Sequence, residues 1–230
     1  MHKKSISEPN LLKLLDERNH KAYYGCNQEW YATEWQRLSG CGPAAACNMI
    51  FYLNHTQPAF GLGQRINSKD SLLSLMEEIW EYVTPTKQGI PTTKMFYEAM
   101  LNYTKAKGLN VEYGFCNVPE NKFHRPELSE IINFLENALI KDAPVAFLNL
   151  CNGEVKNLDR WHWVTIISLE YAEDGNTAFV DILDEGLIKN IDLALWYNTT
   201  RLGGGFVYFT ASPVADKHAL NIGQIVTLEI

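Results

Sequence analysis

The sequence has no long apolar run and few cysteines. No segment of the 230 residues approaches the roughly 18 uninterrupted apolar residues of a membrane span, so we expect none. The residues after Met1 lack the apolar core of a signal peptide. The five cysteines are odd in number and form no Cys-x-x-Cys pair, which argues against a disulfide framework and a zinc site. We therefore expect a cytoplasmic protein with no metal and no cofactor.

Positive charge is also scarce. Lysine and arginine number 20 against 27 acidic residues, so the formal net charge is −7. A nucleic-acid partner or an anionic membrane surface would require a basic face, and we expect neither. The hydrophobic fraction of 46% is enough to bury a substantial core, and the chain contains no internal repeat. Residues 1–230 are therefore predicted to form one globular domain.

The first two thirds of the chain are predicted to be mostly helical. After Pro9, the residues Leu11, Leu12, Leu14 and Leu15 recur on one helical face. Further helices are expected over residues 42–53, 71–83, 93–107 and 128–140. The first of these four is almost wholly apolar or small, which predicts a helix enclosed on most sides.

After Pro144 the pattern changes to short runs of strand-favouring residues, separated by turn chemistry such as Asn152-Gly153. Strands are expected over residues 145–150, 161–169, 177–183, 206–210 and 225–230. Helices followed by strands indicate an α+β fold with an antiparallel sheet. We expect a helical lobe at about 1–142 and a sheet lobe at about 143–230.

The segment Gly40-Cys41-Gly42-Pro43 is the most informative stretch of the sequence. A cysteine just before a proline in the first turn of a buried helix lies at the positive end of the helix dipole, which favours the thiolate. The thiolate is the nucleophilic form of cysteine. The two glycines would let a substrate approach, so that the Cys41 N–H faces a developing oxyanion. We predict that Cys41 is a nucleophile.

The other cysteines lack these flanking residues. Free cysteine is among the most buried residue types, and burial alone accounts for most isolated cysteines. The cysteines predicted to be structural are Cys26, Cys47, Cys116 and Cys151.

A cysteine nucleophile requires a base, and His162 is the one histidine of six that lies within a predicted strand. A strand can hold an imidazole at fixed geometry. The next predicted strand supplies two carboxylates, Asp181 and Asp184, that could orient the ring. The two point to opposite faces, so only one can meet His162. Asp184, at the strand end, is preferred, and Asp181 remains the alternative.

These motifs resemble the papain-like superfamily, and more closely its peptidase C39-like branch, which includes bacterial bacteriocin-processing enzymes. The matching elements are Cys-Gly-Pro at 41–43, His-Trp-Val at 162–164 and an aspartate that ends the following strand. The resemblance implies a papain-like fold with the nucleophile at the start of a helix. It also implies a glutamine that completes the oxyanion hole. Gln36 is the first candidate and Gln28 the second.

One position departs from the family pattern. The family aspartate is commonly followed by proline, whereas Glu185 follows Asp184 here, which keeps Asp181 in consideration.

The predicted activity is hydrolysis of a peptide or amide bond through a Cys-His-Asp triad and a thioester intermediate. The same triad could instead transfer the acyl group to an amine. A third hypothesis is a non-catalytic binding module on the same fold.

Overall fold

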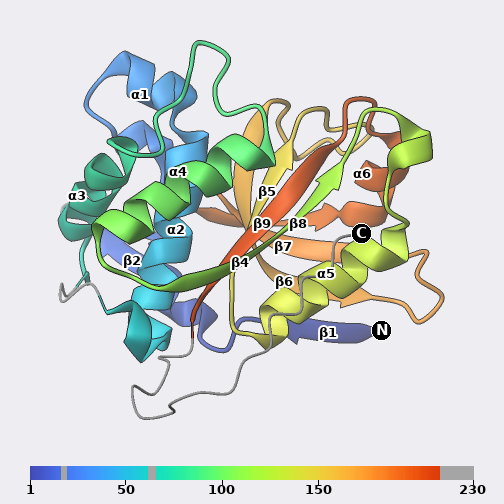
Figure 1. The fold of residues 1–230 in the computed structure, drawn as a ribbon, viewed down its shortest axis with the longest axis horizontal. Helices are drawn as coiled ribbons and strands as arrows, with labels where there is room; N and C mark the ends of the chain where they lie inside the picture. The colour runs from blue at the N-terminus through green and yellow to red at the C-terminus, as the bar shows by residue number, and fades with distance from the viewer. Residues whose placement is uncertain (17–19, 62–65, 213–230) are drawn as a thin grey trace, which may run out of the picture.

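The computed structural model describes residues 1–16, 20–61 and 66–212. Its centre is a seven-stranded sheet in the order β4-β9-β5-β6-β7-β8, in which β1 also pairs with β6 (Figure 1). The strands of this sheet are β1 (His2–Ser5), β4 (Val111–Val118), β5 (Val145–Asn149), β6 (His162–Tyr171), β7 (Ala178–Asp184), β8 (Leu187–Asp192) and β9 (Gly204–Ala211). Every pairing is antiparallel, which confirms the predicted sheet type.

The described residues also form six α-helices. These are α1 (Glu34–Ser39), α2 (Cys41–Thr56), α3 (Lys69–Trp80), α4 (Thr93–Ala106), α5 (Leu128–Ile140) and α6 (Leu193–Thr199). Helices α2 to α5 confirm the four predicted over residues 42–140, and β5, β6, β7 and β9 confirm the strands predicted between 145 and 210. The strand predicted at 225–230 lies outside the described residues.

The helix predicted around Leu11 to Leu15 is wrong. A short 3₁₀ turn (Pro9–Leu12) leads directly into β2 (Lys13–Asp16), which pairs with β3 (Lys21–Tyr24). Leu12 and Leu14 are buried whereas Leu11 and Leu15 are exposed. Burial therefore alternates along the segment as in a strand rather than following a helical stripe.

The sheet also includes two strands from the part of the chain before residue 143, which was expected to be helical. Strand β1 pairs with the far end of β6, and β4 pairs with β9 along its whole length. The sequence alternates Val111, Tyr113 and Phe115 with Glu112 and Gly114, a short strand pattern that went unpredicted, and only Val118 of β4 is buried. Backbone pairing with β9 forms β4, and the region expected to be helical contributes two strands to the sheet.

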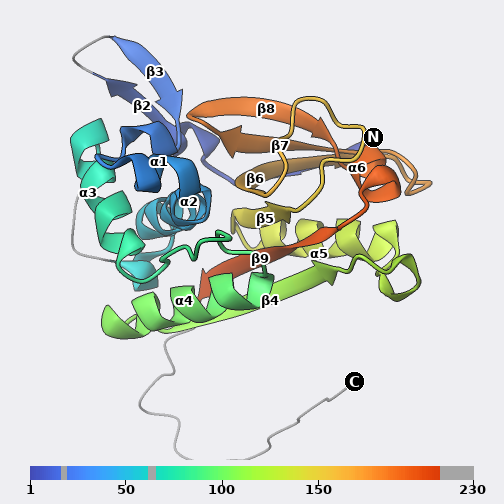
Figure 2. The same ribbon diagram turned by 90° about the horizontal axis from the view of Figure 1, so that it is seen from above.

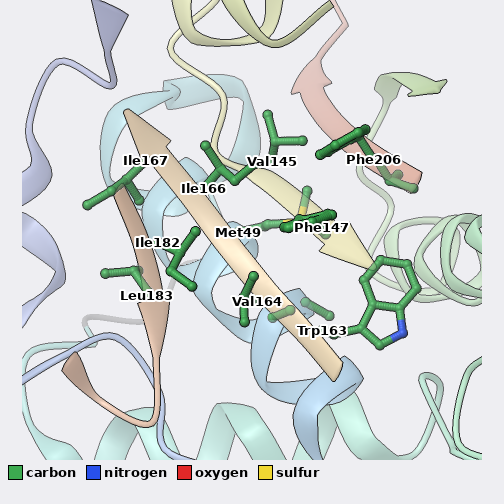
Figure 3. Packing of buried hydrophobic residues seen from close by; sticks show 14 of the residues in the cluster. Met49, Val145, Phe147, Trp163, Val164, Ile166, Ile167, Ile182, Leu183 and Phe206 are labelled. Carbon is green, nitrogen blue, oxygen red and sulfur yellow. The ribbon is translucent and has the colours of Figure 1, made fainter. Parts of the chain in front are cut away.

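Helix α2 is the centre of the core. Residues 42–53 are all buried, as the sequence predicted. The helix packs against β5, β6 and β9 on the sheet and against α3, while α5 covers β6 and β1 (Figure 2). Figure 3 shows Met49 of α2 within the same apolar cluster as Phe147 and Val164 of the sheet. Each fully buried side chain of this kind contributes about 1.5–3 kcal/mol, which fixes α2 against the strands.

Among the described residues, no helix has both the length and the apolar character needed to cross a membrane.

Candidate active site

Cys41 is the first residue of α2. The helix opens with a hydrogen bond of 2.9 Å from the Ala44 N–H to the Gly40 carbonyl. The amides of the first turn have no partner within the helix, and with the helix dipole they favour negative charge at this end. Side-chain space is tight here, since a Cβ atom at Gly42 would lie 2.7 Å from Ile90 Cδ1. The half-buried Cys41 thiol is thus held where a thiolate is stabilised.

His162 begins β6 and Asp184 ends β7. Because these neighbouring strands are antiparallel, the start of one meets the end of the other. His162 Nε2 lies 2.7 Å from Asp184 Oδ1, and both side chains line a small recess together with Cys41. Nδ1 is therefore the ring nitrogen left for the thiol. The structure brings the three residues of the predicted triad together.

Within this cluster, the charged forms of Cys41 and His162 stabilise each other. Burial by itself would raise the pKa of the Cys41 thiol, but the adjacent His162 imidazole and the N–H groups of Trp163 and Gly42 bring it below its usual value. Burial opposes protonation of His162, yet its hydrogen bond to Asp184 and its interaction with Cys41 raise its pKa to about 10. These interactions favour the thiolate of Cys41 and the imidazolium of His162 over their neutral forms.

Asp184 has a second partner that the sequence gave no reason to expect. Lys189 Nζ, from β8, lies 2.6 Å from Asp184 Oδ2 and 3.4 Å from Glu185 Oε2. Burial would raise the pKa of Asp184, but its contacts with His162 and Lys189 hold the pKa below the usual value. In the register of β7 and β8, Lys189 stands opposite Ile182, two residues before Asp184 and on the same face of the sheet, which only the strand pairing could have indicated.

Asp181 lies away from this cluster. In the register of β6 and β7 it stands opposite Ser168, six residues along β6 from His162. Its two carboxylate oxygens accept hydrogen bonds from Ser168 Oγ at 2.6 Å and Asn190 Nδ2 at 2.8 Å. Asp181 is therefore engaged elsewhere on the sheet.

The two candidate glutamines occupy different places. Gln36, the first candidate, forms a capping box with Thr33 at the start of α1 and donates a 2.7 Å hydrogen bond to Glu77. Gln28 instead lines the recess that contains Cys41, His162 and Asp184. Gln28 Nε2 donates one hydrogen bond, of 2.8 Å, to the Arg37 carbonyl. A primary amide has two N–H groups, so a second donor remains. The second candidate, Gln28, is therefore the glutamine that lies in the recess with Cys41.

A buried amide joins the three segments that carry the site. Asn48, in the middle of α2, accepts a 2.7 Å hydrogen bond from the Cys26 N–H just before Gln28. Its Nδ2 donates at 3.1 Å to Thr165 Oγ1, on the strand that begins at His162. Asn48 therefore couples the positions of Gln28, the Cys41 helix and the His162 strand.

A cleft of about 520 Å³ opens beside Cys41. Its walls come from α1, from the loop at 87–91, from the end of β5 and from the start of β6. The residues that line it are Trp35, Leu38, Ser39, Cys41, Lys87, Gln88, Gly89, Ile90, Pro91, Leu148, Leu150, Trp161 and Trp163. Trp163 ties two of these walls together, since its Nε1 donates a 2.8 Å hydrogen bond to the Ile90 carbonyl.

Of the remaining cysteines, Cys26 lines the recess beside Gln28. Cys26 and Cys47 are buried, and burial raises the pKa of Cys116 to about 11. Cys151 differs, because a hydrogen bond from the Arg201 backbone lowers its pKa. Within the part of the chain that the structure describes, no group of three or more His, Cys, Asp or Glu side chains could hold a metal ion.

No protein-family model and no curated protein sequence matches the chain. Among solved structures, the crystal structure of UfSP from C. elegans is similar, with a TM-score of 0.49 and 9% sequence identity. The similarity covers 94% of this chain but only 35% of that one, so this chain spans about a third of the UfSP length. At this level of likeness, function has to be derived from the site residues themselves.

Proposed function

We propose that the protein is a cysteine-dependent hydrolase of peptide or amide bonds. Cys41 is the nucleophile, His162 the general acid and base, and Asp184 the residue that orients His162. The motifs at 41–43 and 162–164 support a papain-like enzyme of the C39-like branch. The five free cysteines are consistent with a reducing compartment such as the cytoplasm.

In the first half of the reaction, the Cys41 thiolate attacks the carbonyl carbon. The Cys41 N–H and the free N–H of Gln28 stabilise the resulting oxyanion. The carbon–nitrogen bond breaks as the His162 imidazolium gives its proton to the leaving amine. The products are a free amine and a thioester on Cys41.

In the second half, neutral His162 takes a proton from water, and the resulting hydroxide attacks the thioester. The carbon–sulfur bond breaks, the carboxylic acid leaves, and the thiolate and imidazolium are restored. Asp184 holds the ring in place and stabilises its positive charge throughout.

One observation supports this proposal above the others. Cys41, His162 and Asp184 line one recess, with His162 Nε2 2.7 Å from Asp184 and the pKa of the Cys41 thiol lowered by the imidazole. A buried structural cysteine has no need of this arrangement, and burial alone would have raised its pKa.

The test is digestion of a denatured-protein mixture by the full chain, with mass spectrometry of the new termini. We expect defined cleavage that Cys41→Ala abolishes and Cys116→Ala leaves intact. Cleavage that survives in Cys41→Ala would contradict the proposal. Added amines measure the share of acyl transfer, since they trap the thioester in competition with water. If substrates bind but neither product forms, the binding-module hypothesis holds instead.

A further inference from the structure

The cleft beside Cys41 is surrounded by large apolar side chains that remain in contact with water. The exposed fraction is 45% for Trp35, 73% for Leu38 and 58% for Trp161. A single exposed apolar residue is ordinary, but three around one concave site mark a surface that a ligand would cover. The cleft volume of about 520 Å³ falls within the range of ligand sites, about 300–1,000 Å³.

The backbone of Trp161 is strained at this place. Its φ angle is 54°, in the left-handed region that bulky residues rarely adopt. Backbone strain of this kind clusters at ligand-binding and active sites. Trp161 directly precedes His162, and its indole lines the cleft rather than the core. The conformation therefore keeps a large aromatic surface beside the nucleophile.

The charge of the cleft differs from that of the whole protein. The formal net charge is −7, yet apart from the Cys41 thiolate the only charged side chain among the described residues that line the cleft is Lys87. A substrate with a positive group gains nothing here, whereas an acidic group near the rim would be attracted by Lys87.

The position of His162 indicates which part of a substrate the cleft holds. His162 lines the small recess and is not among the described residues that line the large cleft. Because His162 must give its proton to the leaving amine, the leaving group lies on its side of Cys41. The cleft is a separate hollow that shares Cys41 and Trp163 with the recess but not His162, and it is left for the acyl part.

We propose that this cleft is a specificity site for a large apolar side chain, preferably aromatic, on the acyl side of the scissile bond. Trp35, Leu38 and Trp161 bury the side chain, and Lys87 favours a neighbouring acidic residue. The inference rests on the proposed hydrolase function, because it takes Cys41 as the atom that receives the acyl group.

The test uses irreversible probes, acetyl-Xaa-Gly and acetyl-Gly-Xaa vinyl sulfones, in which Xaa is Phe, Gly, Asp or Lys. A Cys151→Ser background removes the second low-pKa thiol. The rate of Cys41 modification, mapped by mass spectrometry, is divided by the rate with iodoacetamide. We expect the Phe probe to react about 10–200-fold faster than the Gly probe at one of the two positions, as for other apolar pockets.

Variants then assign the preference to the cleft. Trp161→Ala and Leu38→Ser should each lower the Phe-to-Gly ratio several-fold, whereas Phe123→Ser should not. Phe123 is a matched control, because it is 96% exposed and does not line the cleft. Lys87→Gln should lower the Asp-to-Lys ratio by roughly two- to five-fold at low salt.

The outcomes separate the two proposals. If iodoacetamide modifies Cys41 no faster than Cys116, the hydrolase function fails, and this inference fails with it. If Cys41 is reactive but the Phe-to-Gly ratio is near one, or is the same in Trp161→Ala, only the specificity site is wrong. A preference for phenyl over methyl on the sulfone, without a preference at Xaa, would place the apolar group on the leaving side and overturn the assignment.

Discussion

Lys189 Nζ lies 2.6 Å from Asp184 Oδ2, the carboxylate oxygen that His162 does not use. Asp184 is therefore held between two cationic partners on opposite oxygens. Lys189 fixes the carboxylate and keeps it ionised, so that it can orient the imidazole.

Replacing Lys189 with methionine should move the acidic limb of the pH–rate profile to higher pH. Lys189 holds the pKa of Asp184 down, so its loss lets that pKa rise, and protonation then disables the carboxylate at a higher pH. Lys189→Arg keeps the charge and should restore the limb. Glu185→Gln removes only the partner at 3.4 Å and serves as the control. A purely structural role would lower stability and leave the limb in place.

The same ion pair should appear in the pH dependence of folding. The pKa of Asp184 is lower in the folded protein than its unfolded-state value of 3.8, so ionised Asp184 stabilises the fold at pH values above 3.8. This stabilisation is lost as the pH falls through the folded-state pKa. Urea unfolding of wild type and Lys189→Met should therefore differ at pH 6 and converge in acid. A constant difference down to the acid limit would contradict the pairing.

Asp184→Ala should lower kcat by roughly 10²-fold or more, since it frees the imidazole that supplies the acid–base catalysis. Asp184→Asn retains an oxygen that can orient the ring, and it should lose less activity. The amide leaves Lys189 with Glu185 alone, so some loss is expected. Asp181→Ala, which removes the partner of Ser168, is the control. If Asp181→Ala abolished turnover while Asp184→Ala did not, the two aspartates would exchange roles.

Gln28→Ala should reduce kcat by about 10²–10³-fold, the usual effect of losing one oxyanion donor. Gln36→Ala is the matched control. Gln36 caps α1, so its removal should lower the free energy of unfolding by about 1 kcal/mol and leave the chemical step intact. Steady-state kinetics and denaturant unfolding of both variants decide between them. Equal losses of kcat in Gln28→Ala and Gln36→Ala would show that Gln28 is not part of the oxyanion hole.

Iodoacetamide should label Cys41 faster than Cys116 near pH 6, in the Cys151→Ser background. The pKa of Cys41 is lowered and that of Cys116 is raised to about 11, and below its pKa the thiolate fraction changes about tenfold per unit. His162→Ala removes the main stabilising partner and should slow Cys41 by roughly tenfold or more. A rate for Cys41 that is the same in His162→Ala would contradict the ion pair.

The sequence predicted the strongly patterned parts of the molecule well. The apolar run at 42–53 and the strand-favouring runs after Pro144 appear as α2 and as strands of the sheet. Weak patterns failed. The leucines between 11 and 15 fit a helical face and a strand about equally, and pairing with β3 decides for the strand. The alternation of Val111, Tyr113 and Phe115 in β4 is short and went unpredicted, and the strand pairs with β9 along its whole length.

The site residues that could be predicted are those that lie in a recognisable local sequence motif. Cys41 and His162 lie at the ends of strongly patterned elements, and the structure places them together. Spacing favoured Gln36, whereas the structure places Gln28 in the recess; Thr33-x-x-Gln36 is a capping-box pattern that the sequence already contained. Lys189 carried no local signal, because its contact depends on how β7 and β8 pair.

The buried amide of Asn48 determines how the active site unfolds on heating. Its hydrogen bonds connect the Gln28 segment, the Cys41 helix and the His162 strand inside the core, so these three parts cannot loosen one at a time without leaving a buried polar group unpaired. Heat should therefore remove activity and structure in a single transition. The site therefore has no thermal stability of its own, and it unfolds only when the whole core unfolds.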